Sequence, residues 1–148
     1  MRVWSWELIQ AVLDTNILLS SLRSRAGASH QILLRLAKQE FELVIGNTVL
    51  AEYEEVLKRE CPKIGVSASI VERFLDTVCA ASTFFPTSSY WKPALPDADD
   101  EVFAQLALEA KVGYLVTCNT RHFPPDRLPG LQVSLPREFL KTLKSRNP

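Results

Sequence analysis

The segment Ala11-Val12-Leu13-Asp14-Thr15-Asn16 places a short apolar run directly before three polar residues. A short apolar run indicates a buried strand, and the helical spacing of Ile17, Leu18 and Leu22 that follows indicates an amphipathic helix. We therefore predict a strand, a turn and a helix, with Asp14 at the end of the strand.

The same alternation of strand and helix continues along the chain. Further strands are predicted at 41–45 and 114–117, and further helices at 32–37, 48–59, 67–81, after Asp97 up to a stop at Gly113, and around Phe139, Leu140 and Leu143. Residues 90–96 are expected to form a connecting segment. Because the strands are apolar without polar alternation, both faces of the sheet must be covered. The predicted fold class is α/β, a three-layer α/β/α sandwich with a central, mainly parallel sheet.

Size, charge and cysteine content restrict the number of domains and the kinds of partner and site that the chain can have. The 148 residues suit one domain spanning 1–148, with its core at about 10–143. Seventeen basic and seventeen acidic residues cancel, so any binding of nucleic acid must come from local patches. The three cysteines are odd in number and widely spaced, which disfavours a disulfide framework or a zinc site.

The N-terminal segment does not have the pattern of a signal peptide. Residues 1–6 are followed by Glu7, Gln10 and Asp14 rather than by an uninterrupted apolar core. The longest apolar runs are also shorter than the roughly 20 residues that span a bilayer. We therefore expect a soluble, cytoplasmic protein with no membrane partner.

Acidic residues follow the predicted strands or begin the helices beside them. In parallel sheets, ligands bind beyond the carboxyl ends of the strands, so these groups are expected to converge at one edge. Clustered carboxylates need a cation, and oxygen ligands suit Mg²⁺ or Mn²⁺. Such an ion supports hydrolysis of phosphodiester bonds. The polar residues concerned are Asp14, Glu52, Asp97, Asp99, Asp100 and Asn119.

At these residues the sequence resembles the PIN-domain family. The matching segments, in the same order and at similar spacing, are 12–16, 41–45, 51–57, 97–107 and 115–119, so that the resemblance covers about 10–143. The ending, 121–124 followed by 135–140, is similar to the VapC-like toxins of toxin–antitoxin pairs.

The resemblance implies cleavage of single-stranded RNA with Mg²⁺ or Mn²⁺. By position, Asp14, Glu52 and Asp100 match the three acids that bind the metal and serve catalysis. Asp97 and Asn119 are expected to support the ion or its waters. Asn119 stands where the family usually has Asp, and an amide contributes no negative charge. This departure weakens a second metal site and leaves the three-acid site intact.

The resemblance also implies partners for this chain. A toxin of this kind is expected to pair with a cognate antitoxin that covers the acidic cleft, and to form a homodimer. Thr117 is expected to position the loop that carries Asn119.

Most of these residues also have an ordinary structural interpretation. Asp14 and Asp97 suit helix N-caps, Asp100 suits a first helical turn, and Asn119 suits a turn after a strand. Glu52 and Glu54 border opposite sides of the apolar helix face, so periodicity does not choose between them. His122 is too isolated to be assigned as an acid or base. A patch that binds phosphate, or simply a solvated loop, is expected at Arg121, His122 and Arg127. Packing or a dimer contact is expected, rather than base stacking, for Trp4, Trp6 and Trp91.

Two other functions stay open. The absent fourth acid and the zero net charge fit a non-catalytic PIN scaffold that binds RNA or a protein partner. A different metal-dependent phosphatase or DNA nuclease could use the same sheet. Aspartate-nucleophile phosphatases, however, usually carry a second Asp two residues after the first, where this chain has Asn16.

Overall fold

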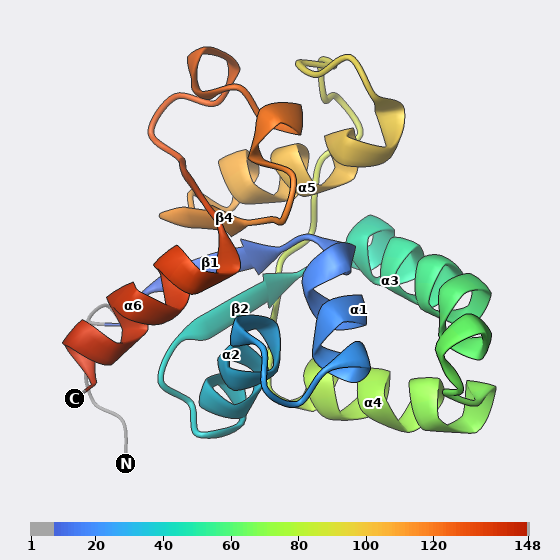
Figure 1. The fold of residues 1–148 in the computed structure, drawn as a ribbon. Coiled ribbons are helices and arrows are strands. Elements are labelled where there is room, and N and C mark those ends of the chain that lie inside the picture. The colour runs from blue at the N-terminus through green and yellow to red at the C-terminus, as the bar shows by residue number, and fades with distance from the viewer. Residues whose placement is uncertain (1–7, 148) are drawn as a thin grey trace.

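The computed structural model describes residues 8–147, and across them it contains one five-stranded sheet. The strands lie in the order β3-β2-β1-β4-β5, and every neighbouring pair is parallel. Helices flank this sheet, which confirms the predicted α/β class and parallel sheet (Figure 1). The strands are β1 (Gln10–Leu13), β2 (Glu42–Ile45), β3 (Thr83–Phe84), β4 (Tyr114–Val116) and β5 (Gln132–Ser134).

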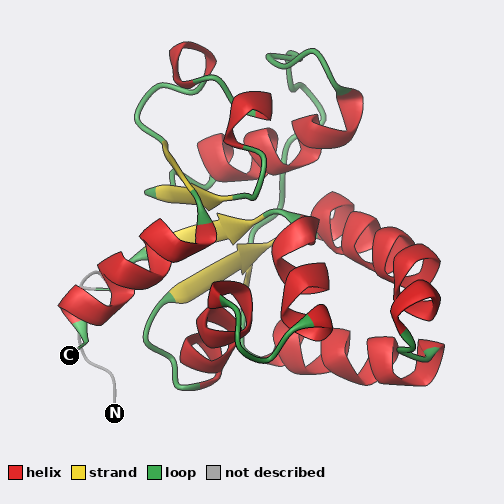
Figure 2. Ribbon diagram, viewed as in Figure 1, coloured by secondary structure: helices red, strands yellow, loops and turns green. Residues whose placement is uncertain are grey.

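The helices occur where the apolar spacing predicted them (Figure 2). In the described part of the chain, none combines the length and apolar character needed to cross a membrane. They are α1 (Thr15–Arg23), α2 (Ala28–Ala37), α3 (Asn47–Glu60), α4 (Ala68–Ala80), α5 (Ala98–Glu109) and α6 (Pro136–Arg146), with short 3₁₀ turns η2 (Cys61–Ile64), η3 (Thr120–His122) and η4 (Pro125–Arg127).

The direction of the strand order reverses between β1 and β4. The chain steps outward from β1 through β2 to β3, then returns to place β4 on the other side of β1. Right-handed crossovers then put the intervening helices on opposite faces. Accordingly, α2 packs against α1 and α6, whereas α5 contacts β1, β2 and β4. Ligands of such sheets bind at the carboxyl ends of the strands where the order reverses, which here is the edge that follows β1 and β4.

The core is built around the two strands at this reversal. Ala11, Val12 and Leu13 of β1 and Leu115 and Val116 of β4 are fully buried. No polar residue interrupts either run, because helices cover both faces of the sheet and both sides of each run are therefore buried. Asp14, directly after β1, and Thr117, directly after β4, are thereby held in fixed positions by the buried sheet.

Two parts of the sequence prediction needed correction. The short strands β3 and β5 were not predicted, because both lie at sheet edges and one of them, β3, exposes 52% of Phe84. The stop at Gly113 was wrong, since α5 ends at Glu109 and Lys111 takes the left-handed backbone conformation at φ 57°. Residues 90–96 do form a connecting segment, as predicted.

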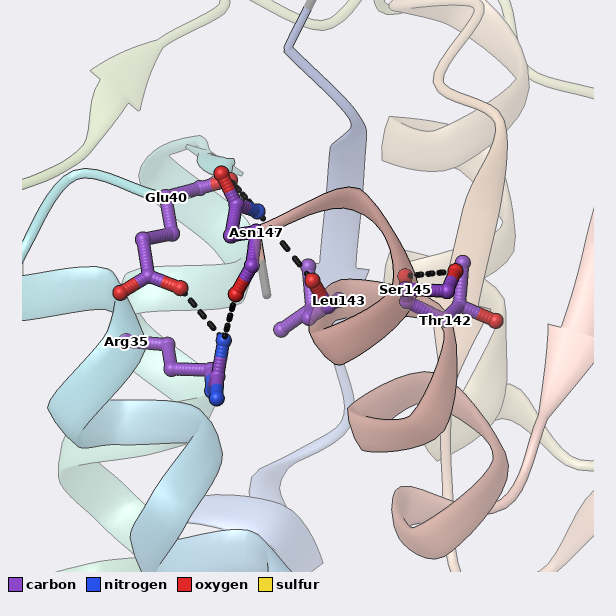
Figure 3. A network of polar contacts seen from close by, with 6 residues as sticks. All are labelled: Arg35, Glu40, Thr142, Leu143, Ser145 and Asn147. Atoms are coloured by element: carbon purple, nitrogen blue, oxygen red, sulfur yellow. Dashed lines mark hydrogen bonds and ion pairs between the residues drawn. The ribbon is translucent and has the colours of Figure 1, made fainter.

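Polar contacts fasten the end of α6 to the end of α2 (Figure 3). Arg35 donates from Nη1 to Glu40 Oε1 at 2.6 Å and to the carbonyl oxygen of Asn147 at 3.4 Å. The amide of Asn147 donates to the carbonyl oxygen of Leu143 at 3.2 Å. These contacts hold the C-terminal end of α6 against α2, the helix with which α6 packs.

Tyr53 ties α3 to the end of β1. Its side chain is fully buried, and its hydroxyl donates to the carbonyl oxygen of Leu13 at 2.6 Å. Its ring also lies 6.2 Å from that of Phe103 on α5. The residue directly before it in α3 is Glu52, so this hydrogen bond sets where Glu52 stands relative to Asp14.

We expect Tyr53→Phe to lower the free energy of unfolding by about 1–2 kcal/mol, because the carbonyl of Leu13 loses its buried donor. Chemical denaturation followed by circular dichroism measures this loss. Tyr90→Phe is the matched control, since Tyr90 is 92% exposed and should change stability by less than about 0.5 kcal/mol. Equal effects of the two substitutions would contradict the structural role given to Tyr53.

Candidate functional site

Asp14 is a buried carboxylate directly after β1, with only 8% of the residue exposed. Its Oδ2 accepts hydrogen bonds from Thr117 Oγ1 at 2.7 Å and from Asn16 Nδ2 at 3.3 Å. Burial raises the pKa of Asp14, and the Thr117 hydrogen bond opposes that rise without cancelling it. Asp14 occupies the N-cap position of α1 without a capping hydrogen bond of standard geometry, although the backbone N–H groups of Thr15 and Asn16 also oppose the rise of its pKa. The helix-cap interpretation therefore accounts for only part of its surroundings.

Thr117 joins the two central strands at the site. The register pairs Leu13 with Val116, so that the next residues, Asp14 and Thr117, lie side by side. The fully buried hydroxyl of Thr117 donates to Asp14 and also accepts from the backbone N–H of Asn119 at 3.0 Å. Thr117 therefore positions the loop, as predicted. Its contact with Asp14 was missed, and the parallel pairing of the two strands was the signal that could have revealed it.

Asp100 lies in the first turn of α5 and faces the loop after β4. Its side chain is 14% exposed, and its Oδ2 lies 3.4 Å from Nδ1 of His122. Burial first, and then the negative charge of Asp97, raise the pKa of Asp100 to about 6, and the charges of Asp14 and Asp99 add to this rise. The sequence analysis left His122 unassigned as an acid or base and missed its pairing with Asp100, because 22 positions separate the two and no local pattern links them.

The two aspartates that precede Asp100 have different surroundings. Asp97 caps α5, with its carboxylate accepting from the backbone N–H of Asp99 at 2.9 Å, which confirms the N-cap interpretation. Asp99 is exposed. Asp100 is the least exposed of the three, and the charge of Asp14 contributes to its raised pKa, whereas Asp99 contributes to the raised pKa of Glu52. The structure therefore favours Asp100 over Asp99 as the inward-facing acid.

Glu52 and Glu54 are distinguished by their surroundings. Glu54 is exposed and lies 3.7 Å from the ammonium of Lys58 on the same helix. Glu52 is half-buried, and its pKa is raised first by burial and then by nearby carboxylates that include Asp99 and Asp14. Of these two glutamates, Glu52 is therefore the one that lies near Asp14 and Asp99.

The three acids do not form a closed ligand cage. Within residues 8–147, no three side chains of His, Cys, Asp or Glu are grouped closely enough to hold a metal ion as they stand. Asp14 still acts electrostatically on both Glu52 and Asp100, raising the pKa of each. Oxygen donors fit Mg²⁺ or Mn²⁺, and Mg²⁺ usually keeps several waters and takes only one or two carboxylates directly. The donor set therefore fits a hydrated divalent ion.

Asn119 has a structural role in the loop after β4. It begins the turn η3, and its carbonyl oxygen accepts from the backbone N–H of His122 at 3.0 Å. Its side chain is exposed, and no hydrogen bond of that side chain is seen within residues 8–147. These contacts support the turn interpretation, and nothing in them tests a role with a metal.

A cleft of about 270 Å³ opens beside Asp100. It is lined by Asp97, Asp100, Arg121 and His122 between Pro96 and Pro124. The segment before α5 that borders this region is held by Glu101, which accepts from Trp91 Nε1 at 2.6 Å and from the backbone N–H of Ala94 at 2.7 Å. Trp91 thus has the packing role that was favoured for it, whereas Trp4 and Trp6 lie outside the described residues.

Comparisons with known proteins agree with this geometry. No curated protein matches the chain. Among solved structures, a chain of the crystal structure of VapBC2 from Rickettsia felis bound to a DNA fragment from their promoter shares the fold, with a TM-score of 0.63 and 20% identity over 86% of this chain and 98% of that one. The family model described as PIN domain matches residues 10–121, which include Asp14, Glu52, Asp100 and Asn119. The chain therefore belongs to the PIN domain family.

Proposed function

We propose that this protein is a metal-dependent endoribonuclease that cleaves phosphodiester bonds of single-stranded RNA. The observation that carries the proposal is the buried Asp14 at the reversal of the strand order, with Glu52 and Asp100 near enough for their pKa values to respond to its charge. Repelling carboxylates at a ligand-binding edge are stabilised when a cation joins them. Membership of the PIN domain family supports the same chemistry.

Each acid has a place in the proposed mechanism. Asp14, Glu52 and Asp100 would hold Mg²⁺ or Mn²⁺, directly or through its waters, and Asp97 and Asn119 would support those waters. A divalent ion, when bound, supplies a Lewis acid that polarises the phosphate and activates water for in-line attack. Thr117 keeps Asp14 oriented through its 2.7 Å hydrogen bond, so that the carboxylate does not rotate away from the edge.

The cleft beside Asp100 suits the RNA backbone. Arg121 and His122 line it and are exposed, so they offer positive charge or hydrogen-bond donors to phosphate oxygens next to the acids. Because the net charge is zero, such local groups must supply the attraction for RNA.

We further propose that the chain is the toxin of a toxin–antitoxin pair, with a cognate antitoxin that covers the acidic edge and with a second copy of itself as partner. The structural likeness to a VapBC2 chain supports this proposal at the level of the fold.

The alternative is a non-catalytic PIN scaffold that binds RNA or a protein. Two observations favour it: the acids are not assembled as a ligand cage, and Asn119 replaces a charged position of the family pattern. RNA binding that is unaffected by EDTA, together with no cleavage at any Mn²⁺ or Mg²⁺ concentration, would favour the scaffold over the nuclease.

We expect Asp14→Asn to reduce Mn²⁺-dependent cleavage of single-stranded RNA by at least about a hundredfold, because the site loses its most buried charge. The increase in melting temperature that Mn²⁺ gives the wild-type protein should also disappear. Gel analysis of RNA products and thermal unfolding provide the two measurements.

Asp76→Asn serves as the control for this prediction, because Asp76 is exposed on α4, away from the acidic edge. It should keep both the activity and the metal response. A folded Asp14→Asn protein that degrades RNA at the wild-type rate would refute the assignment.

The raised pKa of Asp100 predicts a pH dependence of metal affinity. A carboxyl group with a pKa of about 6 is protonated below that pH and must lose its proton before it binds a cation. We therefore expect the affinity for Mn²⁺ to rise between about pH 5 and pH 7 and to level off above, as measured by calorimetric titration. Asp100→Asn should flatten this rise, and a wild-type affinity that does not change over the interval would contradict the prediction.

A further inference from the structure

A second cleft, of about 360 Å³, lies outside the acidic site. It is an open cleft bordered by the end of α1, the start of α2, the start of α6 and Cys118 in the loop after β4. None of the residues that line it is a carboxylate. Its size falls in the range of small-ligand pockets, which run from about 300 to 1,000 Å³.

The rim of this cleft carries positive charge. Arg23 and Arg137 line it, both are exposed, and no ion pair with a carboxylate is found for either within residues 8–147. Glu138, the acid next to Arg137 in the chain, is already used by the backbone N–H of Leu135, which donates to it at 2.9 Å. Two guanidinium groups are therefore available to an anionic ligand, and guanidinium binds phosphate through paired hydrogen bonds.

Most of the lining surface is apolar, although Ser20, Ser24 and Ser29 add hydroxyl groups to it. Ala28 of α2 and Leu135 and Pro136 at the start of α6 contribute to the apolar part. An apolar surface under a cationic rim suits a ligand with a flat, weakly polar ring and an attached phosphate. A nucleotide has this combination, whereas a free inorganic anion would leave the apolar lining uncovered.

The cleft is directly linked to the acidic site. Cys118 donates from its backbone N–H to Asn16 Oδ1 at 3.3 Å, and Asn16 donates from Nδ2 to Asp14 at 3.3 Å. The loop then continues from Cys118 to Arg121 and its neighbour, which line the cleft beside Asp100. The loop after β4 thus contributes to both clefts, each of which has arginine on its wall, and it is hydrogen-bonded to Asp14 through Asn16.

We propose that the second cleft binds one nucleotide of the single-stranded RNA substrate, next to the phosphate that is cut. The base lies on the apolar lining, and its phosphate is held by Arg23 and Arg137. This inference rests on the proposed ribonuclease function and adds a substrate subsite to it. RNA is favoured over a protein partner because the available charge is cationic, and because Cys118 of the cleft is joined to Asp14 by hydrogen bonds through Asn16.

The test is RNA binding by the double variant Arg23→Gln/Arg137→Gln, measured in EDTA so that no cleavage occurs. The probe is a fluorescein-labelled oligouridine of about ten nucleotides, a length within the usual site sizes for single strands. We expect Kd to rise at least about tenfold. The slope of log affinity against log salt should fall by about 0.7, the value for one lost phosphate contact on a single strand.

The matched control is Arg73→Gln/Lys111→Gln, which removes the same charge from exposed positions on α4 and after α5. It should leave Kd within about twofold, because these positions do not line the cleft and salt largely screens the attraction between exposed charges that are far apart. Equal RNA affinity in the two double variants, both folded by circular dichroism, would overturn the proposal and leave the cleft to a protein partner.

Alkylation of Cys118 gives a second readout that needs no substitution. Cys118 is the exposed cysteine of the three, whereas Cys61 is buried and Cys79 half-buried. The reaction with iodoacetamide is followed by mass spectrometry at alkaline pH, where thiols form the reactive thiolate. Saturating oligouridine should slow the modification of Cys118 several-fold, and an unchanged rate would count against the subsite.

The two proposals can fail separately. A protein that never cleaves RNA but loses oligouridine binding in Arg23→Gln/Arg137→Gln would refute the nuclease and keep the subsite. A protein that cleaves RNA with Mn²⁺ but binds oligouridine equally in both double variants would keep the nuclease and refute the subsite.

Discussion

The hydrogen bond between Thr117 and Asp14 is the interaction on which the site depends. A carboxylate that is 8% exposed loses much of its hydration, and the donors from Thr117 and Asn16 replace only part of it, because its pKa is still raised. Both partners are fixed by the strands that precede them, since Leu13 and Val116 are paired in the sheet. The fold thus holds a charge that is not fully compensated at the edge where its strand order reverses.

The other two acids are held more loosely. Glu52 and Asp100 come from helices, are less buried than Asp14, and stand near it without forming a cluster of ligands. A site with one rigid acid and two partly solvated ones leaves room for the waters that Mg²⁺ retains. The same arrangement explains how Asn119 can follow β4 without disturbing the site: its backbone, held by Thr117 and capping η3, does the positioning.

The sequence predicted the parts of the molecule that its apolar pattern controls. The strands β1, β2 and β4 are buried on both faces, so their runs are uniformly apolar and easy to recognise. The edge strands β3 and β5 are short and partly exposed, and no such run marks them. Side-chain pairs such as Asp100 with His122 depend on how α5 and the loop after β4 meet in space, which periodicity along the chain does not specify. The choice of Glu52 over Glu54 came from the family pattern and is explained by their different neighbours.

The parallel pairing of β1 with β4 also affects how the protein can be made. Because 103 positions separate Asp14 from Thr117, the hydrogen bond between them cannot form while the ribosome still covers the second residue. β5 must follow as well, since Thr117 donates from its backbone N–H to Ser134 at 3.0 Å. Long-range parallel pairing is also slow to form. A nascent chain therefore exposes Asp14 long before it can complete the acidic edge, which must wait until Thr117 and Ser134 have left the ribosome.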